Sequence, residues 1–347
     1  MPAHSQGRKS FCKACTSSRG KPVPEITYRE AVAQAMREAL DQDPRVFLMG
    51  EDIGPYGGAF AVTKGFWEEY GKRRIKDSPL SESAIVGAGV GAAMAGLRPI
   101  VELMTINFSL LAMDQIVNHA AKMRYMSGGQ LSVPLMVRTV TGAGASVAAT
   151  HSQSFEGWFA SVPGIHVVVP SSPEDVLGLF RSCREMEDPV IFVEHILLYS
   201  SRGEAPDSDL KIPLGQAAVK RAGTDVTIVS YSRMAQTSLA AAELLYKEGI
   251  DAEVVDLRTL RPLDSETVIG SVKKTHRAVV VEEATGFGGF AGEISSQIQE
   301  AAFDYLDNPV RRVAGAETPM PYSMPLEQLA IPDANSVAAA VRDLVSE

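Results

Sequence analysis

Two side chains of this chain stand where they could carry acid–base chemistry, and the first is Glu82. It is the acid directly before a long run of Gly, Ala, Val and Met, in the stretch SESAIVGAGVGAAMAGL. A carboxyl group in a dry site keeps its proton more readily than one in water and can share it with a ligand nitrogen. The alternative is an acid at the start of a helix, stabilised by free backbone N–H groups and the helix dipole.

The second is His151, in the stretch THSQSFEGWF, with Gly142 and Gly144 shortly before it. A histidine flanked by small and polar residues on a loop could serve as an acid or a base near neutral pH. The alternative is a surface histidine without a catalytic role. Composition alone favours that alternative.

The other motifs in the chain do not support a specific ligand site or catalytic centre. Gly87, Gly89 and Ala92 match the glycine spacing of dinucleotide-binding turns, but the preceding RRIKDSPLSES is not an apolar strand and the pattern lies within a helix. Cys12 and Cys15 form one CxxC pair, and no second pair completes a zinc site. Nucleophile-elbow, HExxH and P-loop motifs are absent from the sequence.

The totals of the sequence exclude several classes of protein. Its 347 residues suffice for two domains, with 45% hydrophobic and 22% charged residues. The net charge of −9 argues against a nucleic-acid partner, which needs a basic face. The longest apolar run, 84–97, is too short to span a membrane, and three cysteines cannot build a disulfide framework.

Strand-like and helix-like segments alternate along the chain. Thr27 is expected to cap a helix that ends near Asp43, and the apolar run 46–50 that follows is expected to be a strand. The four glycines in 87–96 predict a helix packed very closely against a neighbour, and 110–129 is expected to be one amphipathic helix. This alternation predicts an α/β fold of two doubly wound, mainly parallel-sheet domains.

Composition also predicts how the chain is divided. Residues 1–24 hold five Lys or Arg and no acid, which indicates a disordered N-terminal extension or a transit peptide. We expect a first domain over 25–199, a linker over the turn-rich 200–215 and a second domain over 216–347.

Four blocks of the sequence together resemble a known family. They are LSESAIVGAGVGAAMAGLRPIVELMTINFSLLAMDQIVNHAAKMRYMSGG, HSQSFEGWFASVPG, DPVIFVEHILLY and VVDLRTLRPLD. The family is that of the beta subunits of thiamine-diphosphate-dependent 2-oxoacid dehydrogenases, and the pyruvate type is the most similar. The resemblance runs from about residue 25 to the end. It implies a transketolase-like pyrimidine-binding domain followed by a transketolase C-terminal-like domain.

The resemblance implies specific roles for three side chains. Glu82 matches the acid that hydrogen-bonds N1′ of the cofactor's aminopyrimidine, and Phe108 matches the aromatic residue that stacks on that ring. His151 matches the channel histidine that assists transfer to the lipoyl group. The implied reaction is oxidative decarboxylation of pyruvate with reductive acetylation of the lipoyl group of the acyltransferase component. The whole complex would then yield acetyl-CoA and CO₂.

The resemblance also implies partners and metals. In this family an alpha subunit holds the diphosphate and Mg²⁺ through a GDG motif, which this sequence lacks. The chain is therefore expected to act within an α₂β₂ heterotetramer and to be inactive alone. The family often holds a structural K⁺ through backbone carbonyl groups, and the matching positions here are Leu135, Cys183, Arg184, Met186 and Asp188.

Several alternatives stay open on the sequence alone. Acetoin and branched-chain 2-oxoacid dehydrogenases share most of the four blocks, although Trp158 favours the pyruvate and acetoin types. A transketolase split into two chains would transfer a ketol unit without a lipoyl partner. A non-catalytic assembly protein could keep the same fold. We expect a bacterial cytoplasmic protein, with the mitochondrial matrix or a plastid as the other locations.

Overall fold

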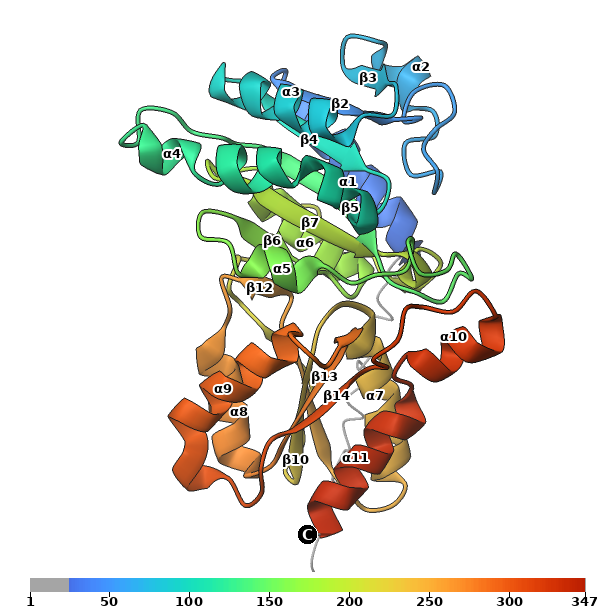
Figure 1. Ribbon diagram of the computed structural model, residues 1–347, viewed down its shortest axis with the longest axis vertical. Helices are drawn as coiled ribbons and strands as arrows, with labels where there is room; N and C mark the ends of the chain where they lie inside the picture. Colours follow the sequence, from blue (N-terminus) through green and yellow to red (C-terminus); the bar gives the residue numbers. More distant parts are fainter. Residues whose placement is uncertain (1–24, 347) are drawn as a thin grey trace, which may run out of the picture.

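The computed structural model describes residues 25–346, which form two α/β halves stacked along the long axis of the molecule (Figure 1). The expected N-terminal extension and the Cys12–Cys15 pair lie outside the described residues. Each half has one large sheet with helices on both faces, so the predicted α/β class with two mainly parallel sheets is confirmed. No helix within residues 25–346 is long and apolar enough to cross a membrane.

The first sheet has seven strands in the order β12-β6-β7-β5-β4-β2-β3. All neighbours are parallel except β12, which runs antiparallel to β6. The strands are β2 (Val46–Glu51), β3 (Ile75–Ser78), β4 (Arg98–Leu103), β5 (Met136–Thr141), β6 (His166–Val168), β7 (Val190–His195) and β12 (Thr259–Arg261).

Helices cover both faces of this sheet because alternate strand residues are apolar on each face. One face packs on α1 (Tyr28–Gln42) and α6 (Pro173–Cys183). The other packs on α3 (Glu82–Met94), η1 (Ile106–Ala112), η2 (Gln115–Ala120) and α5 (Glu156–Ala160). The expected cap of α1 is confirmed, since Thr27 and Glu30 form a reciprocal capping box.

The glycine-rich helix α3 packs as its sequence predicts. A Cβ atom on Gly89 would lie 2.8 Å from Cγ1 of Val101 and 3.0 Å from Cδ1 of Leu135. Only glycine therefore lets α3 approach β4 and the start of β5 this closely. Strand β3 leads directly to the start of this helix, so the close approach also fixes the position of its first residue, Glu82.

The prediction of one amphipathic helix over 110–129 is wrong. The segment runs as the 3₁₀ helix η1, then the π-helix η2, then the short α4 (Met123–Met126). In the wide turn, the backbone N–H of Ala121 donates to the carbonyl of Ile116 at 3.0 Å. The π turn still buries the apolar residues Ile116 and Ala120, because it keeps both on the side where η2 packs against α3.

The second sheet has five strands in the order β14-β13-β10-β11-β9, with β9 antiparallel at one edge. Helices α7 and α11 cover one face, and α8 and α9 cover the other (Figure 1). Its elements are β9 (Ala218–Arg221), β10 (Val226–Ser230), α7 (Ser232–Tyr246), β11 (Ala252–Asp256), α8 (Ser265–Thr275), β13 (Ala278–Thr285), α9 (Phe290–Ala302), β14 (Arg311–Gly315), α10 (Met324–Ala330) and α11 (Ala334–Ser346).

The two halves are joined more closely than the sequence predicts. Strand β12 comes from the C-terminal half of the sequence but pairs with β6 of the first sheet. The start of the expected linker forms β8 (Arg202–Glu204), which pairs with β1 (Glu25–Thr27). The division of the chain at 200–215 stays a prediction.

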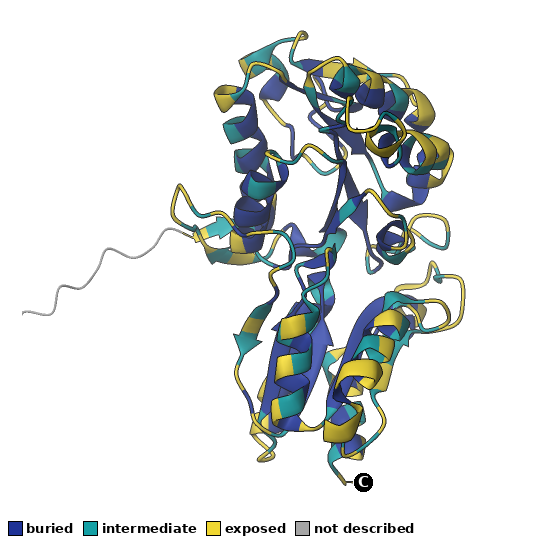
Figure 2. Ribbon diagram, turned by 90° about the vertical axis from the view of Figure 1, so that its left-hand side faces the viewer, coloured by how far each residue is buried: buried dark blue, intermediate teal, exposed yellow. Residues whose placement is uncertain are grey.

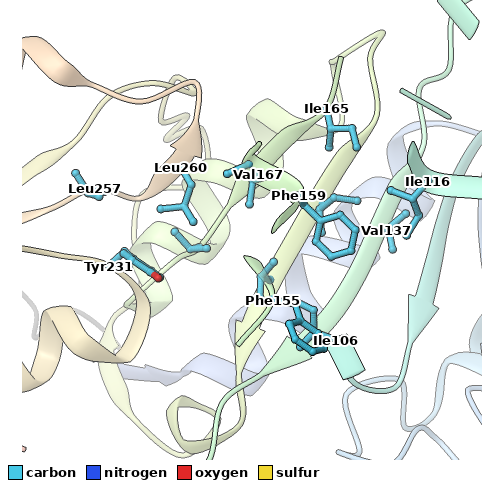
Figure 3. Packing of buried hydrophobic residues seen from close by; sticks show 14 of the residues in the cluster. Ile106, Ile116, Val137, Phe155, Phe159, Ile165, Val167, Tyr231, Leu257 and Leu260 are labelled. Carbon is cyan, nitrogen blue, oxygen red and sulfur yellow. The ribbon is translucent and has the colours of Figure 1, made fainter. Parts of the chain in front are cut away.

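The core is continuous between the halves. The central strands of both sheets are buried, and the outer faces of the helices are exposed (Figure 2). One apolar cluster runs from Phe155 and Phe159 in and beside α5 to Tyr231, Leu257 and Leu260 of the C-terminal half (Figure 3). This continuity holds the two halves in a fixed relation.

Candidate active site

The structure brings the segments with the three predicted catalytic and cofactor-binding residues to one edge of the first sheet. Glu82 follows β3, Phe108 follows β4, and His151 follows β5. These strands are parallel, so their carboxyl ends share one edge. Open α/β sheets bind their ligands at this edge.

Glu82 is the first residue of α3 and is only 5% exposed. Within residues 25–346, no hydrogen bond or ion pair engages its carboxylate. None of its atoms is among the fully buried side-chain polar atoms that lack a hydrogen-bond partner, so solvent still reaches the carboxylate. The carboxylate is therefore free to hydrogen-bond to a ligand group that enters beside it.

A second acid, Glu51, lies beside this site and was missed by the sequence analysis. It ends β2 and pairs in register with Ser78, the last residue of β3. Burial raises the pKa of Glu51, and the charges of Asp52 and Glu82 add to the increase. Only the pairing of β2 with β3 brings Glu51 near Glu82, which is 31 positions further along the chain by their numbers.

Phe108 and His151 are in direct contact. Their ring centroids lie 5.3 Å apart with an interplanar angle of 84°, an edge-to-face arrangement. Phe108 is half-buried in η1, whereas His151 is exposed on the loop that follows β5. The Nδ1 atom of His151 lies 2.9 Å from the hydroxyl oxygen of Thr150. The aromatic residue and the histidine thus form one surface at the same edge of the sheet.

The loop that carries His151 starts at a junction between the two halves. The Nε2 atom of His195 lies 2.9 Å from a carboxylate oxygen of Glu283, and the backbone N–H of Ala143 donates to the other oxygen at 2.7 Å. Gly142 has φ +100°, and a Cβ atom there would lie 2.1 Å from Nε2 of His195. Glycine is therefore required at this position, which explains the first glycine of the TGAGAS stretch.

The three carboxyl groups at this junction differ in their pKa values. Although burial alone would raise it, the neighbouring His195 holds the pKa of Glu283 below its usual range. Burial raises the pKa of both Glu156 and Glu282 to about 7. The junction therefore combines an ionised carboxylate with two carboxyl groups that are partly protonated near neutral pH.

A buried ion cluster lies within the first sheet. Arg138 on β5 is 1% exposed and contacts Glu102 on β4 and Glu194 on β7. One guanidinium nitrogen donates to Glu194 at 2.8 Å and to the hydroxyl of Tyr199 at 3.1 Å, and that hydroxyl donates to Glu194 at 2.7 Å. The cluster links three adjacent strands, all of which contribute to the candidate site or its frame.

The five residues predicted to hold K⁺ line one small cavity of about 20 Å³. This volume suits one water-sized sphere. Arg98 also lines the cavity, and its guanidinium donates to the carbonyls of Arg184 at 2.8 Å and Met186 at 3.0 Å. Two of the expected ligands therefore already have a cationic partner. Burial raises the pKa of the Cys183 thiol, so a nucleophilic role for this cysteine is not supported.

Comparison with known proteins places this architecture in a class. The family described as "Transketolase, pyrimidine binding domain" matches residues 24–201, and "Transketolase, C-terminal domain" matches 215–337. A solved structure described as "Split gene transketolase, inactive beta4 tetramer" superimposes with a TM-score of 0.75 at 24% identity, covering 92% of this chain and 98% of that one. The fold is thus that of a two-domain transketolase-like protein.

Similar curated proteins identify one family within this class. The chain is 47% identical over 337 residues to "Pyruvate dehydrogenase E1 component subunit beta-1, mitochondrial" of Arabidopsis thaliana, covering 96% of this chain and 93% of that protein. It is 46% identical to "Pyruvate dehydrogenase E1 component subunit beta" of Rickettsia felis, covering 92% and 98%. The chain belongs to the family of pyruvate dehydrogenase E1 beta subunits, which implies the use of thiamine diphosphate.

Proposed function

We propose that this chain is the beta subunit of a pyruvate dehydrogenase decarboxylase component and that Glu82 is its acid for thiamine diphosphate. One observation carries the proposal. Glu82 is a buried carboxylate without a protein partner among residues 25–346, at the ligand-binding edge of a parallel sheet. The buried position suits a ring nitrogen that must share a proton, because water would otherwise compete for the carboxyl group.

We propose that two side chains at this edge of the sheet bind the aromatic ring of the cofactor. Glu82 would hold a proton at N1′ of the aminopyrimidine, and Phe108 would stack on the ring. When bound, thiamine diphosphate supplies the nucleophile and electron sink for decarboxylation of a 2-oxoacid. We propose that His151, which contacts Phe108, exchanges a proton with the lipoyl group that accepts the acetyl unit.

The diphosphate of the cofactor needs residues from another chain. The sequence has no GDG motif, so we propose that an alpha subunit holds the diphosphate and Mg²⁺ in an α₂β₂ assembly. Large apolar side chains exposed on this chain are consistent with a partner surface, among them Tyr56 at 71%, Leu111 at 64% and Phe287 at 88% exposed. The lipoyl-bearing acyltransferase is the proposed second partner, and the bacterial cytoplasm the proposed location, with import into an organelle as the alternative.

The decisive experiment compares this chain with and without a co-expressed alpha subunit. The measured quantity is 2-oxoacid-dependent reduction of an artificial electron acceptor in the presence of thiamine diphosphate and Mg²⁺. We expect activity only for the pair, highest with pyruvate. Higher activity with acetoin or branched-chain 2-oxoacids would reassign the substrate, and ketol transfer without a lipoyl partner would indicate a split transketolase. Activity of the chain alone would contradict the two-subunit proposal.

The K⁺ site is a separate proposal with its own measurement. If the carbonyls of Leu135, Cys183, Arg184, Met186 and Asp188 bind K⁺, the assembly should have a higher Tm in KCl than in choline chloride of equal ionic strength, because a ligand stabilises the state that binds it. Arg98 is the competing cation at these carbonyls. Equal Tm values in the two salts would mean that Arg98 alone supplies the charge.

A further inference from the structure

The loop between β5 and α5, which carries His151, has an unusual backbone. Ser146 and Ala148 have φ values of +55° and +66°, in the left-handed region that residues other than glycine rarely adopt. The backbone N–H of His151 donates to the carbonyl of Ala148 at 3.2 Å. Such strained backbone persists only where surrounding contacts hold it in place. We call residues 144–153 the histidine loop.

The first end of the histidine loop is held by Glu327, a fully buried residue of α10 in the C-terminal half. Its carboxylate accepts hydrogen bonds from the backbone N–H of Gly144 at 2.8 Å and of Ser146 at 3.0 and 3.2 Å. The hydroxyl of Ser146 donates at 3.3 Å. Hydrogen bonds to an ionised carboxylate are stronger than those between neutral groups. The strained residue Ser146 is therefore fixed directly by the second half of the molecule.

The second end is held by Asn107, the neighbour of Phe108. Its side-chain oxygen accepts from the backbone N–H and from the side-chain amide of Gln153, both at 3.1 Å. Its amide group donates to the hydroxyl of Thr105 at 3.0 Å. Asn107 is 6% exposed, so water competes little for these bonds. Buried hydrogen bonds between Asn107 and Gln153 thus join the two segments that carry Phe108 and His151.

We propose that Glu327 and Asn107 are positioning residues that hold His151 for the transfer step. The inference rests on the proposed function, because it assigns His151 to lipoyl transfer. It adds that the C-terminal half, which carries no proposed cofactor-binding residue, sets the geometry of the site through Glu327. A displacement of the histidine by about 1 Å can reduce the rate of a positioned reaction about 100-fold.

The test uses the assembly with its alpha subunit and measures two reactions separately. The variants are Glu327→Gln, which loses the charge, and Asn107→Leu, which loses the link to Gln153. We expect kcat/KM for reductive acetylation of a lipoyl domain to fall at least about 10-fold in each. Pyruvate-dependent reduction of the artificial acceptor should stay within about twofold, because the histidine loop is not needed for it. Asn107→Asp keeps an acceptor oxygen for Gln153 and should recover part of the loss.

Hydrogen exchange supplies a readout that does not depend on catalysis. Amides of the histidine loop should exchange at least about 10-fold faster in Glu327→Gln than in the wild type, since the carboxylate that protects Gly144 and Ser146 is gone. The matched control is Glu243→Gln, an exposed glutamate of α7 in the same half. It should change neither exchange nor transfer.

Three results separate the inference from the proposed function. Unchanged exchange in Glu327→Gln, or faster exchange with wild-type lipoyl transfer, would overturn the positioning role. A His151→Ala variant with wild-type lipoyl transfer would overturn the role assigned to the histidine itself. An inactive wild-type assembly would instead contradict the proposed function, while the exchange result would still report whether Glu327 holds the loop.

Discussion

Replacement of Glu82 by glutamine is expected to reduce pyruvate-dependent activity of the assembly with its alpha subunit by at least about 100-fold. Glutamine has the same shape but cannot donate and accept the proton that the aminopyrimidine ring requires. The measurement is kcat for reduction of the artificial acceptor at saturating pyruvate, thiamine diphosphate and Mg²⁺. A parallel titration of the cofactor by calorimetry would separate lost binding from lost chemistry.

The variant should fold normally, because Glu82 has no partner within residues 25–346 whose bond would be lost. Its Tm should therefore be close to that of the wild type. Glu68→Gln is the matched control, an exposed acid of the short helix α2 (Phe66–Tyr70). Wild-type activity of Glu82→Gln would contradict the assignment and would favour the alternative of a non-catalytic assembly protein.

Replacement of Arg138 by methionine should strongly destabilise the first half of the molecule. Removal of one partner from a buried ion cluster costs about 3–5 kcal/mol, because the remaining charges have neither water nor a counterion. Here two carboxylates, Glu102 and Glu194, would be left within the sheet. The measurement is the shift of the first unfolding transition in urea, followed by circular dichroism.

The loss should depend on pH. Burial raises the pKa of Glu102 even beside Arg138, and removal of the arginine would raise it further. When a carboxyl group has a higher pKa in the folded than in the unfolded state, the free energy of unfolding falls as the pH rises toward the folded-state pKa. Arg138→Met should therefore lose more stability relative to the wild type at pH 8 than at pH 6.

A triple variant provides the control for the ion cluster. Glu102→Gln and Glu194→Gln in the Arg138→Met background remove the charges left unpaired, so much of the lost stability should return. If Arg138→Met alone is as stable as the wild type at both pH values, the carboxylates do not depend on the arginine and this account of the cluster fails.

Local signals in the sequence predicted much of the fold correctly. Thr27 and Glu30 stand three residues apart, so their capping box could be expected from spacing alone. The glycines of α3 predicted close helix packing, which the Gly89 contacts confirm. The segment 110–129 was predicted wrongly because apolar spacing does not distinguish an α-helix from a chain that passes through 3₁₀ and π turns.

The sequence by itself determined the class of fold, the family and the identities of Glu82, Phe108 and His151 as candidates. The class of fold follows from the periodicity of apolar residues, whereas the family, Phe108 and the roles of Glu82 and His151 follow from the resemblance of four sequence blocks to a known family. The tertiary structure alone decided that Phe108 touches His151 and that Arg138 lies between two glutamates. It also decided that Glu327 binds Ser146 and Gly144 of the histidine loop, which lie 181 and 183 positions before it in the sequence. Hydrogen bonds and ion pairs act over a few ångströms in space, and the pairing of strands and the packing of helices set which distant residues come that close.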